Sequence, residues 1–263
     1  MAANLSNNTV TGERIQKVLA RAGHGSRREV ESWVRDGRVE VNGKRAELGA
    51  AITHQDKVTL DGKRLRLGSE RIKPRVIALH KPAGVICSKK VMRGEKSVYK
   101  LLPRLERSRW VSVGRLDINT SGLLLFTNYG ELASRLMHPR YQLDREYAVR
   151  VYGQVSDDAL QRMRDGVEID GETYQLSDVV LGEDHGTPGS NKWYYCVVRQ
   201  GRNREVRKTW ESQGVQVSRL SRVRFANIIL PRRLRPGKFQ EVEGVALSDL
   251  YSLVDLREPE TID

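Results

Sequence analysis

Apolar residues recur at helical spacing in two stretches near the N-terminus, residues 15–22 and residues 26–34. After these stretches the apolar positions alternate. The dipeptides Asn42-Gly43 and Asp61-Gly62 then supply the residue types that tight hairpin turns require. The pattern therefore predicts two helices followed by small β-hairpins over residues 12–67.

The rest of the chain alternates between short apolar runs, which predict strands, and helical patterns. Strands are expected at residues 76–79, 123–126, 145–151 and 193–199, and through Leu220. A helix is expected at residues 131–138, where Pro139 ends it, and another after Gly201, where Gly214 ends it. Residues 153–192 predict further strands and a helix, with a loop at 184–190.

The length and composition fit one larger body with one small domain attached. The chain has 263 residues, and 38% of them are hydrophobic, which is enough for packed cores. The expected segments are a disordered leader at 1–11, a small domain at 12–67, a linker at 68–74, a larger domain at 75–255 and a tail at 256–263.

The charge balance indicates a polyanionic partner, because the formal net charge is +13 and the sequence pI is near 9.9. Basic residues outnumber acidic ones by 16 to 9 over residues 11–75 and by 12 to 2 over residues 199–238. The sequence contains no apolar run near the length of a membrane span and no lipidation motif, so we expect no membrane partner. Cys87 and Cys196 lie far apart, and we expect reduced packing residues in a cytoplasmic protein.

The start of the second predicted helix has an unusual charge. Ser26 and Glu29 have the spacing of a capping box, and Arg27 and Arg28 lie between them. Positive charge in the first turn of a helix opposes the helix macrodipole. The arginines make sense if a phosphate docks at this helix start, although basic residues can also form an ordinary solvated surface.

One carboxylate, Asp117, lies on a polar loop directly before the apolar run at residues 123–126. An acid at the mouth of a buried strand is subject to desolvation and needs a partner, and such positions often carry chemistry. The alternative is an ordinary turn aspartate that accepts a hydrogen bond from its own backbone, as Asn119, Thr120 and Ser121 also suggest.

The loop reads Gly-Arg-Leu-Asp-Ile-Asn-Thr-Ser-Gly-Leu-Leu-Leu from Gly114 to Leu125, and it resembles a motif of the bacterial ribosomal-RNA pseudouridine synthases. The Lys81-Pro82-Ala83-Gly84 turn is similar to a second motif of that family. Residues 13–67 resemble the RNA-binding domain named for ribosomal small-subunit protein four. The resemblance covers about residues 13–250, with the motifs in the family order.

The resemblance implies roles for four residues. Asp117 would be the essential catalytic residue, Arg207 its ion-pair partner, Tyr147 the ring that packs on the target uracil, and Leu220 a contact of that ring and base. From the pattern alone, Tyr147 could equally be a core residue on the same strand face as Val149 and Val151. Likewise Arg207 could belong to a solvated face with Arg204, Lys208 and Glu211, and Leu220 shares a predicted pleat face with Ser218, Arg222 and Arg224.

The implied fold class is α+β, with a small α/β RNA-binding domain followed by a catalytic domain on a long, mostly antiparallel mixed sheet. The implied reaction converts a uridine of large-subunit ribosomal RNA to pseudouridine, without a cofactor or a metal, in a monomer whose partner is ribosomal RNA or a pre-ribosomal particle. The candidate RNA contacts are Arg14, Lys17, Arg21, Arg27, Arg28, Arg38, Asn42, Lys44, Lys81, Arg115, Arg202, Arg204 and Arg222.

Three questions stay open from the sequence. Asp117 can act as nucleophile or as general base, and the alternatives to a large-subunit synthase are a small-subunit synthase and a non-catalytic RNA-binding factor. The chain also departs from the family pattern at Ala226 and Asn227, where relatives usually have a glycine at the first position. If that position needs a positive φ angle, the alanine strains the turn.

Overall fold

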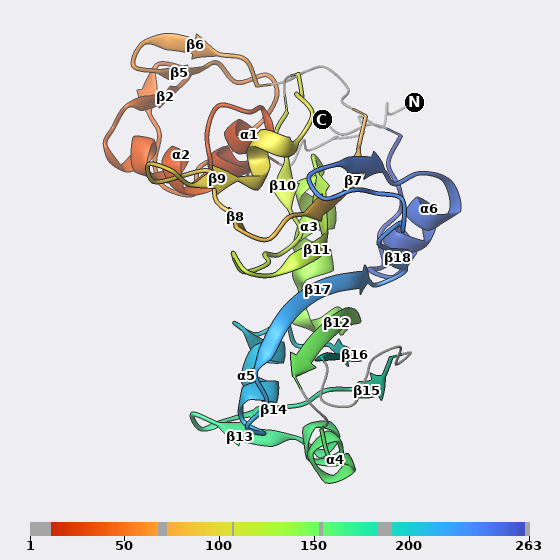
Figure 1. Cartoon of the computed structure of the whole chain (residues 1–263). Coiled ribbons are helices and arrows are strands. Elements are labelled where there is room, and N and C mark those ends of the chain that lie inside the picture. Colours follow the sequence, from red (N-terminus) through yellow and green to blue (C-terminus); the bar gives the residue numbers. More distant parts are fainter. Residues whose placement is uncertain (1–11, 68–72, 107, 153–154, 183–190, 261–263) are drawn as a thin grey trace, which may run out of the picture. The chain divides into compact units, whose positions relative to one another are not determined.

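The computed structural model describes residues 12–67, 73–106, 108–152, 155–182 and 191–260, so the leader and most of the linker expected from the sequence lie outside the described residues. The chain forms two compact units (Figure 1). The first contains the described residues up to Lys73 together with those of the segment Arg104–Arg109 and Glu260, and the second contains Pro74–Pro103 and the described part of Trp110–Pro259.

The first unit has two helices and a small sheet, as the apolar pattern predicts. Its helices are α1 (Ile15–Arg21) and α2 (Arg27–Arg35). The sheet has the order β3-β2-β5-β6, with β2 Val39–Val41, β3 Lys44–Arg45, β5 Val58–Leu60 and β6 Lys63–Leu65. A separate two-stranded ladder pairs β1 (Glu13–Arg14) with β4 (Ala51–Ile52).

Local sequence signals explain the ends of these elements. Ser26 and Glu29 form the capping box at the start of α2, since each side chain accepts the other residue's backbone N–H, at 3.1 and 2.7 Å. Both predicted turn dipeptides take positive φ angles, 53° and 81° at Asn42-Gly43 and 50° and 76° at Asp61-Gly62.

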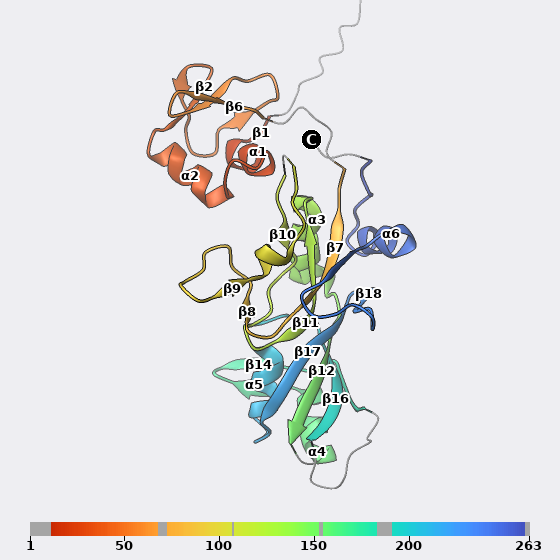
Figure 2. The same cartoon turned by 45° about the horizontal axis from the view of Figure 1, so that its top comes forward.

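The second unit is built on one long mixed sheet of the order β15-β16-β12-β17-β11-β7-β19, to which β10 and β18 add short strands (Figure 2). The strands are β7 Val76–Lys81, β10 Val111–Ser112, β11 Ser121–Thr127, β12 Arg145–Tyr152, β15 Asp178–Leu181, β16 Asn191–Val198, β17 Val217–Phe225, β18 Ile228–Ile229 and β19 Phe239–Glu241. Among the described strands of this sheet, β11 and β17 make the one parallel pair. The predicted long, mostly antiparallel mixed sheet is confirmed.

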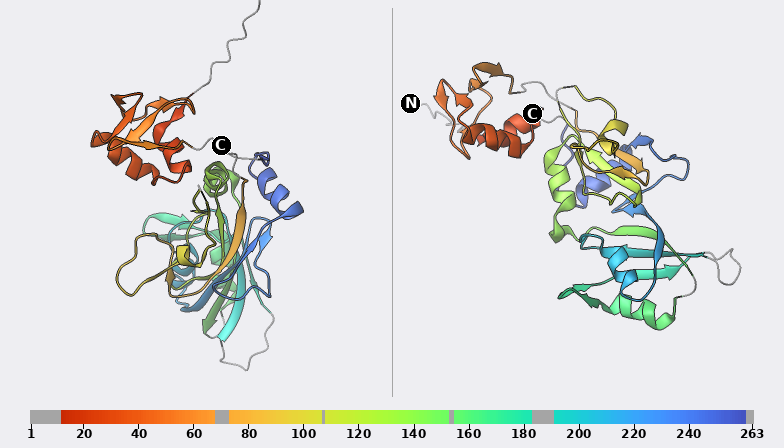
Figure 3. Two further views of the ribbon diagram at one scale, coloured as in Figure 1. Left: turned by 90° about the horizontal axis from the view of Figure 1, so that it is seen from above. Right: turned by 60° about the vertical axis from the view of Figure 1, so that its left-hand side comes forward.

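Helices and smaller ladders complete the second unit. The α-helices are α3 Gly130–Met137, α4 Asp157–Asp165, α5 Glu205–Glu211 and α6 Gly244–Ser252, and the 3-10 helices are η1 Val98–Leu101 and η2 Pro139–Tyr141. Two further ladders pair β8 (Val85–Ile86) with β9 (Lys96–Ser97), and β13 (Val167–Ile169) with β14 (Glu172–Tyr174). Figure 3 shows α3 in green and α6 in blue beside β7, and one buried apolar cluster joins these helices to β7 and β11.

Gly122 allows the two halves of the sheet to meet. It lies opposite Arg222 in the short parallel ladder between β11 and β17. Its φ angle is 104°, and a Cβ atom at this position would lie 2.2 Å from the carbonyl oxygen of Arg222. Only glycine fits such a close approach of two backbones. Strand packing therefore requires Gly122, the second glycine of the motif that contains Asp117.

Candidate active site

Asp117 lies on a tight turn between β10 and β11. The backbone N–H of Thr120 donates to the carbonyl of Asp117 at 3.0 Å, which closes the turn. Asp117 is partly buried, while Ile118 and Asn119 at the tip of the turn are exposed. The carboxylate therefore lies at the mouth of the buried strand β11, where the sequence predicts it.

Three successive carbonyls of this turn accept hydrogen bonds from other elements. The Ile118 carbonyl accepts the backbone N–H of Gly84 at 2.7 Å. The Asn119 carbonyl accepts Nη2 of Arg207 at 3.1 Å, and the Thr120 carbonyl accepts Nζ of Lys81 at 2.7 Å. The backbone that carries Asp117 is thereby fixed to the turn after β7 and to α5.

Lys81 has a different position from the one expected for an RNA contact. Its side chain is fully buried, and its ammonium donates to the carbonyls of Pro82, Ile118 and Thr120 at 3.0, 3.3 and 2.7 Å. Burial lowers the pKa of Lys81, and the nearby Cys87 and Asp117 oppose that change. The expected RNA contact at Lys81 is therefore replaced by a structural role in the Asp117 turn.

Arg207 is also buried, with 8% of its surface exposed, although the helical pattern placed it on a polar face with Arg204. Its Nη1 donates to the Val217 carbonyl at 3.0 Å, while Nη2 holds the Asn119 carbonyl. Among the described residues no ion pair within 4.0 Å joins Arg207 to Asp117. The two charges still act on each other: burial lowers the pKa of Arg207, and the Asp117 carboxylate opposes that effect.

A single row across the sheet contains Lys81 and two further candidates, Arg222 and Tyr147. Lys81 lies opposite Gly122, Gly122 opposite Arg222, and Arg222 opposite Tyr147. Directly opposite residues share a face of the sheet, so the side chains of Lys81, Arg222 and Tyr147 lie on one face, with the side-chain-free Gly122 between Lys81 and Arg222 in the row. Leu220 lies opposite Val149 and is on this face too.

Arg222 is 2% exposed, which differs from the expected RNA contact. Its Nε donates to the Leu123 carbonyl at 2.8 Å, and its Nη2 is buried without a hydrogen-bond partner among the described residues. Its guanidinium lies 5.3 Å from the centre of the Phe225 ring, a cation–π contact. The buried guanidinium contributes positive charge to the row that contains Tyr147.

The prediction that Arg224 shares the face of Leu220 is wrong. A β-bulge between Glu146 and Tyr147 leaves Val223 without an opposite residue and places Arg224 opposite Glu146. Nε of Arg224 donates to Oε2 of Glu146 at 2.8 Å on the other face of the sheet. The bulge shifts the alternation by one residue, which the sequence pattern does not reveal.

The expected strain at Ala226 is present, because its φ angle is 51°. Its backbone N–H donates to the Asp144 carbonyl at 2.8 Å, and the Asn227 side chain donates to the Ala246 carbonyl at 2.8 Å. The departure from the family pattern therefore lies at a residue with left-handed backbone, outside the row that contains Tyr147.

Comparison with known proteins identifies the family of the chain. The sequence model of the family described as RNA pseudouridylate synthase matches residues 75–212, just over half of the chain. The chain belongs to this family. The S4 domain model matches residues 13–58 of the first unit.

Curated members of the pseudouridine synthase family extend the match over almost the whole chain. The "Ribosomal large subunit pseudouridine synthase B" of Pseudomonas aeruginosa is 48% identical over 94% of this chain, which spans 64% of that protein's length. The protein of the same name from Escherichia coli O6:H1 is 48% identical over 95% of this chain and 85% of its own. A solved structure titled "Crystal structure of pseudouridylate synthase" has the same fold, with a TM-score of 0.62 and 22% identity over 92% of this chain and 100% of that chain.

The basic residues of the S4 domain differ in their availability to a ligand. Arg14, Arg27, Arg28 and Lys44 are exposed, and within the described residues their side chains form no hydrogen bond or ion pair. Lys17 and Arg21 instead pair with Glu13, at 2.7 and 2.5 Å. Arg38 pairs with Asp61 at 2.5 Å, and the amide of Asn42 donates to Asp56 at 2.7 Å.

The second unit, which contains the match to the family model, is called the synthase domain below. The basic residues around its helix α5 also differ in their availability. Arg115 is exposed beside the Asp117 turn. Arg202 donates to the Thr173 carbonyl at 2.8 Å and lies 5.1 Å from the Tyr174 ring centre, so it fastens the β13–β14 hairpin. Arg204 has a φ angle of 51° and lies 3.4 Å from Glu211. Of these three, Arg115 is the freest to contact a ligand.

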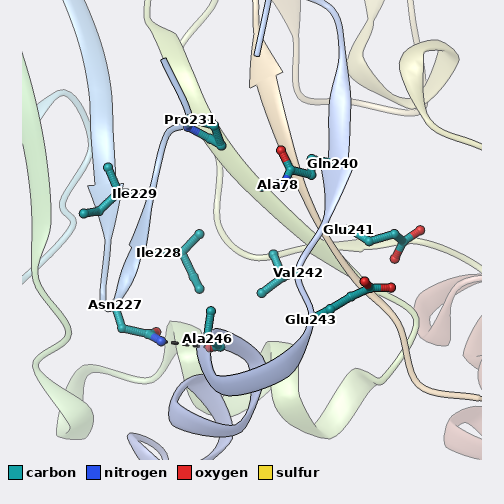
Figure 4. Close-up of a pocket in the computed structure, with 10 residues that line it drawn as sticks. All are labelled: Ala78, Asn227, Ile228, Ile229, Pro231, Gln240, Glu241, Val242, Glu243 and Ala246. Carbon is teal, nitrogen blue, oxygen red and sulfur yellow. Dashed lines mark hydrogen bonds between the residues drawn. The ribbon is translucent and has the colours of Figure 1, made fainter. Parts of the chain in front are cut away.

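A pocket elsewhere in the synthase domain contains none of the candidate catalytic residues (Figure 4). It lies between β18, β19 and the start of α6, and its lining includes Asn227, Ile228, Val242 and Glu243.

Across the described parts of the chain, no cluster of three or more His, Cys, Asp or Glu side chains could hold a metal ion. No helix in those parts is long and apolar enough to span a membrane.

Proposed function

We propose that this protein converts a uridine of large-subunit ribosomal RNA to pseudouridine, with Asp117 as the catalytic residue. The observation that carries the proposal is the Asp117 turn, whose carbonyls are held by Lys81, Gly84 and Arg207 beside the row that contains Tyr147. The names of the relatives, which refer to the large subunit, support the choice of RNA.

The reaction is an isomerisation, so no external group is transferred. The bond between C1′ of the ribose and N1 of uracil breaks, the base turns, and C5 bonds to C1′. The proton on C5 leaves and N1 gains one, which balances the reaction without a cofactor. These atoms are inaccessible in a base stack, so the target nucleotide must first leave the stack and enter the site.

Each candidate residue has a part in this reaction. Asp117 acts at the ribose as nucleophile or general base, and both roles need its ionised form. The Asp117 carboxylate acts on the buried cations of Lys81 and Arg207, because it opposes the lowering of their pKa values by burial. Tyr147 and Leu220 offer the apolar surface on which the free base packs.

The exposed Arg14, Arg27, Arg28, Lys44 and Arg115 are the candidates for phosphate contacts. Their charge would attract the RNA from a distance and hold it in register, while the Asp117 site acts on one base. We place the reaction in the cytoplasm and assign it to a monomer.

The test is a map of pseudouridines in ribosomal RNA from cells with and without this protein. We expect at least one large-subunit position to lose its pseudouridine when the protein is absent and to regain it when the gene is restored. Loss confined to small-subunit RNA would contradict the choice of substrate, and an unchanged map would contradict the activity.

A further inference from the structure

The sheet of the synthase domain has a second face, opposite Tyr147, on which large apolar side chains lie in solvent. We call it the aromatic face. Its residues come from β12, β15, β16 and β17, which lie side by side (Figure 1), and they are Arg150, Tyr152, Val180, Trp193, Tyr195 and Arg219. The exposed fractions are 36% for Trp193, 39% for Tyr195, 48% for Val180 and 72% for Tyr152.

Strand register places these residues together. Trp193 lies opposite Arg150, which lies opposite Arg219. In the next row on this face, Val180 lies opposite Tyr195. Side chains alternate between the faces of a strand, so Ala148 and Arg150 point away from the face of Tyr147.

Small residues keep the face flat around the rings. Ala148 lies opposite Tyr195 on one side and Ser221 on the other. Gly182 borders the same ring, and a Cβ atom there would lie 3.0 Å from Cε2 of Tyr195. A flat surface with two exposed rings on one strand, about 7 Å apart, suits the planar faces of nucleic-acid bases.

The charge of the face indicates the same kind of ligand. Arg150 and Arg219 lie directly opposite each other, and two like charges in such a pair destabilise a sheet. Within the described residues neither arginine forms an ion pair, and Nε of Arg150 is buried without a hydrogen-bond partner. Of the carboxylates on this face, Glu146 is occupied by Arg224 at 2.8 Å, and Asp178 lies at the edge strand β15.

We propose that the aromatic face binds an unpaired stretch of RNA. Its bases would stack on Trp193 and Tyr195, and its phosphates would pair with Arg150 and Arg219, because aromatic rings beside cations bind single strands without reading their sequence. The choice of RNA rests on the proposed function, and the face would hold a part of the substrate away from the reacting uridine. A purely apolar protein partner is disfavoured by two unpaired guanidinium groups at the centre of the face.

The test uses the full-length protein and single-stranded oligoadenylate, which contains no uridine and cannot be a substrate. Stacking on Trp193 quenches its fluorescence, and replacing Trp193 with Phe removes that signal while leaving a ring for the base. We expect oligoadenylate to quench the parent protein and not Trp193→Phe. The double variant Trp193→Ala, Tyr195→Ala should bind at least about tenfold more weakly.

The charges are tested with a matched pair of double variants. Arg150→Gln with Arg219→Gln should make the fall of log K for oligoadenylate with log salt less steep by about 1.4, which corresponds to two lost phosphate contacts at about 0.7 each. The control is Arg232→Gln with Arg233→Gln, which changes two exposed arginines outside the aromatic face. The control variant should reduce the steepness of the salt dependence less than the first pair does.

Two results would overturn the proposal. One is oligoadenylate binding that neither quenches Trp193 nor weakens in the double alanine variant. The other is a parent protein that sediments as a dimer and a double alanine variant that sediments as a monomer, since the face would then join two copies of the chain. Because oligoadenylate has no uridine, either result is independent of whether the protein makes pseudouridine.

Discussion

Arg207 combines two roles in one side chain, since it fixes the Asp117 turn and brings a positive charge near its carboxylate. Its two terminal nitrogens donate to different carbonyls, those of Asn119 and Val217, which a planar fork can reach at once. Lysine keeps the charge but not the fork. Arg207→Lys should therefore lower the single-turnover rate about a hundredfold through misplacement of the turn.

The control for Arg207 is Arg204→Lys at the N-cap of the same helix, where the side chain is exposed and its pair with Glu211 spans 3.4 Å. That variant should keep most of the rate. RNA affinity should fall much less than the rate in Arg207→Lys, and an equal fall in both would make Arg207 a phosphate contact.

Two substitutions of Tyr147 distinguish a role in packing on the base from a role in proton transfer. Tyr147→Phe keeps the ring on the face shared with Leu220 and removes the hydroxyl alone, whereas Tyr147→Ala removes both. If the ring mainly packs on uracil, the Phe variant should retain far more single-turnover activity than the Ala variant. Equal, nearly complete loss in both, in proteins with the parent's circular dichroism, would assign the hydroxyl an essential proton transfer.

At the scale of elements, the candidate active site depends on how closely β11 and β17 approach each other. A methyl group at Gly122 would lie 2.2 Å from a backbone oxygen and 2.6 Å from a backbone nitrogen of Arg222, and neither atom can move without its strand. Gly122→Ala should destabilise the protein by about 3 kcal/mol and lower activity, measured by denaturant unfolding and single-turnover kinetics. Gly130→Ala is the control, because nothing lies within 4 Å of its new methyl group; equal stability of the two variants would contradict the packing argument.

The elements show what the sequence can and cannot predict. Ser26 with Glu29, Asn42-Gly43, and the apolar run of β11 are local signals, and each forms the structure expected of it. The burial of Lys81 is not local, because it depends on carbonyls about 40 residues further along the chain. A lysine that ends the mostly apolar strand β7 is the one hint of it in the sequence.

The site shows the same division. The family motif places Asp117, Tyr147, Arg207 and Leu220 on the candidate list, and the structure brings their elements together around β17. The bulge at Val223 and the burial of Arg222 could not be predicted, because pleat alternation assumes an unbroken register. The pairing of strands that are distant in the sequence, and not the residue type, decides which arginine side chains are exposed to solvent.

At the scale of the whole molecule, the basic charge of the S4 domain should contribute to the salt dependence of RNA binding. Arg27 and Arg28 are exposed in the first turn of α2 and oppose its macrodipole. Arg27→Gln with Arg28→Gln should lower the slope of log K against log salt by about 1.4 to 1.8 for ribosomal RNA while thermal stability holds or rises slightly. Arg35→Gln, in the last turn of the same helix, is the control, and an unchanged slope in the double variant would mean that this helix start does not touch RNA.

The central claim is that Asp117 carries out the reaction, and its most direct test is the single-turnover formation of pseudouridine by Asp117→Asn. Asparagine keeps the size and the hydrogen-bonding capacity of the side chain and removes its charge, and the turn is held through backbone carbonyls that this change does not touch. We expect a folded protein that binds ribosomal RNA like the parent and forms no pseudouridine. Activity within about tenfold of the parent would contradict the assignment, because general acid–base catalysis alone contributes about 100-fold to 10,000-fold.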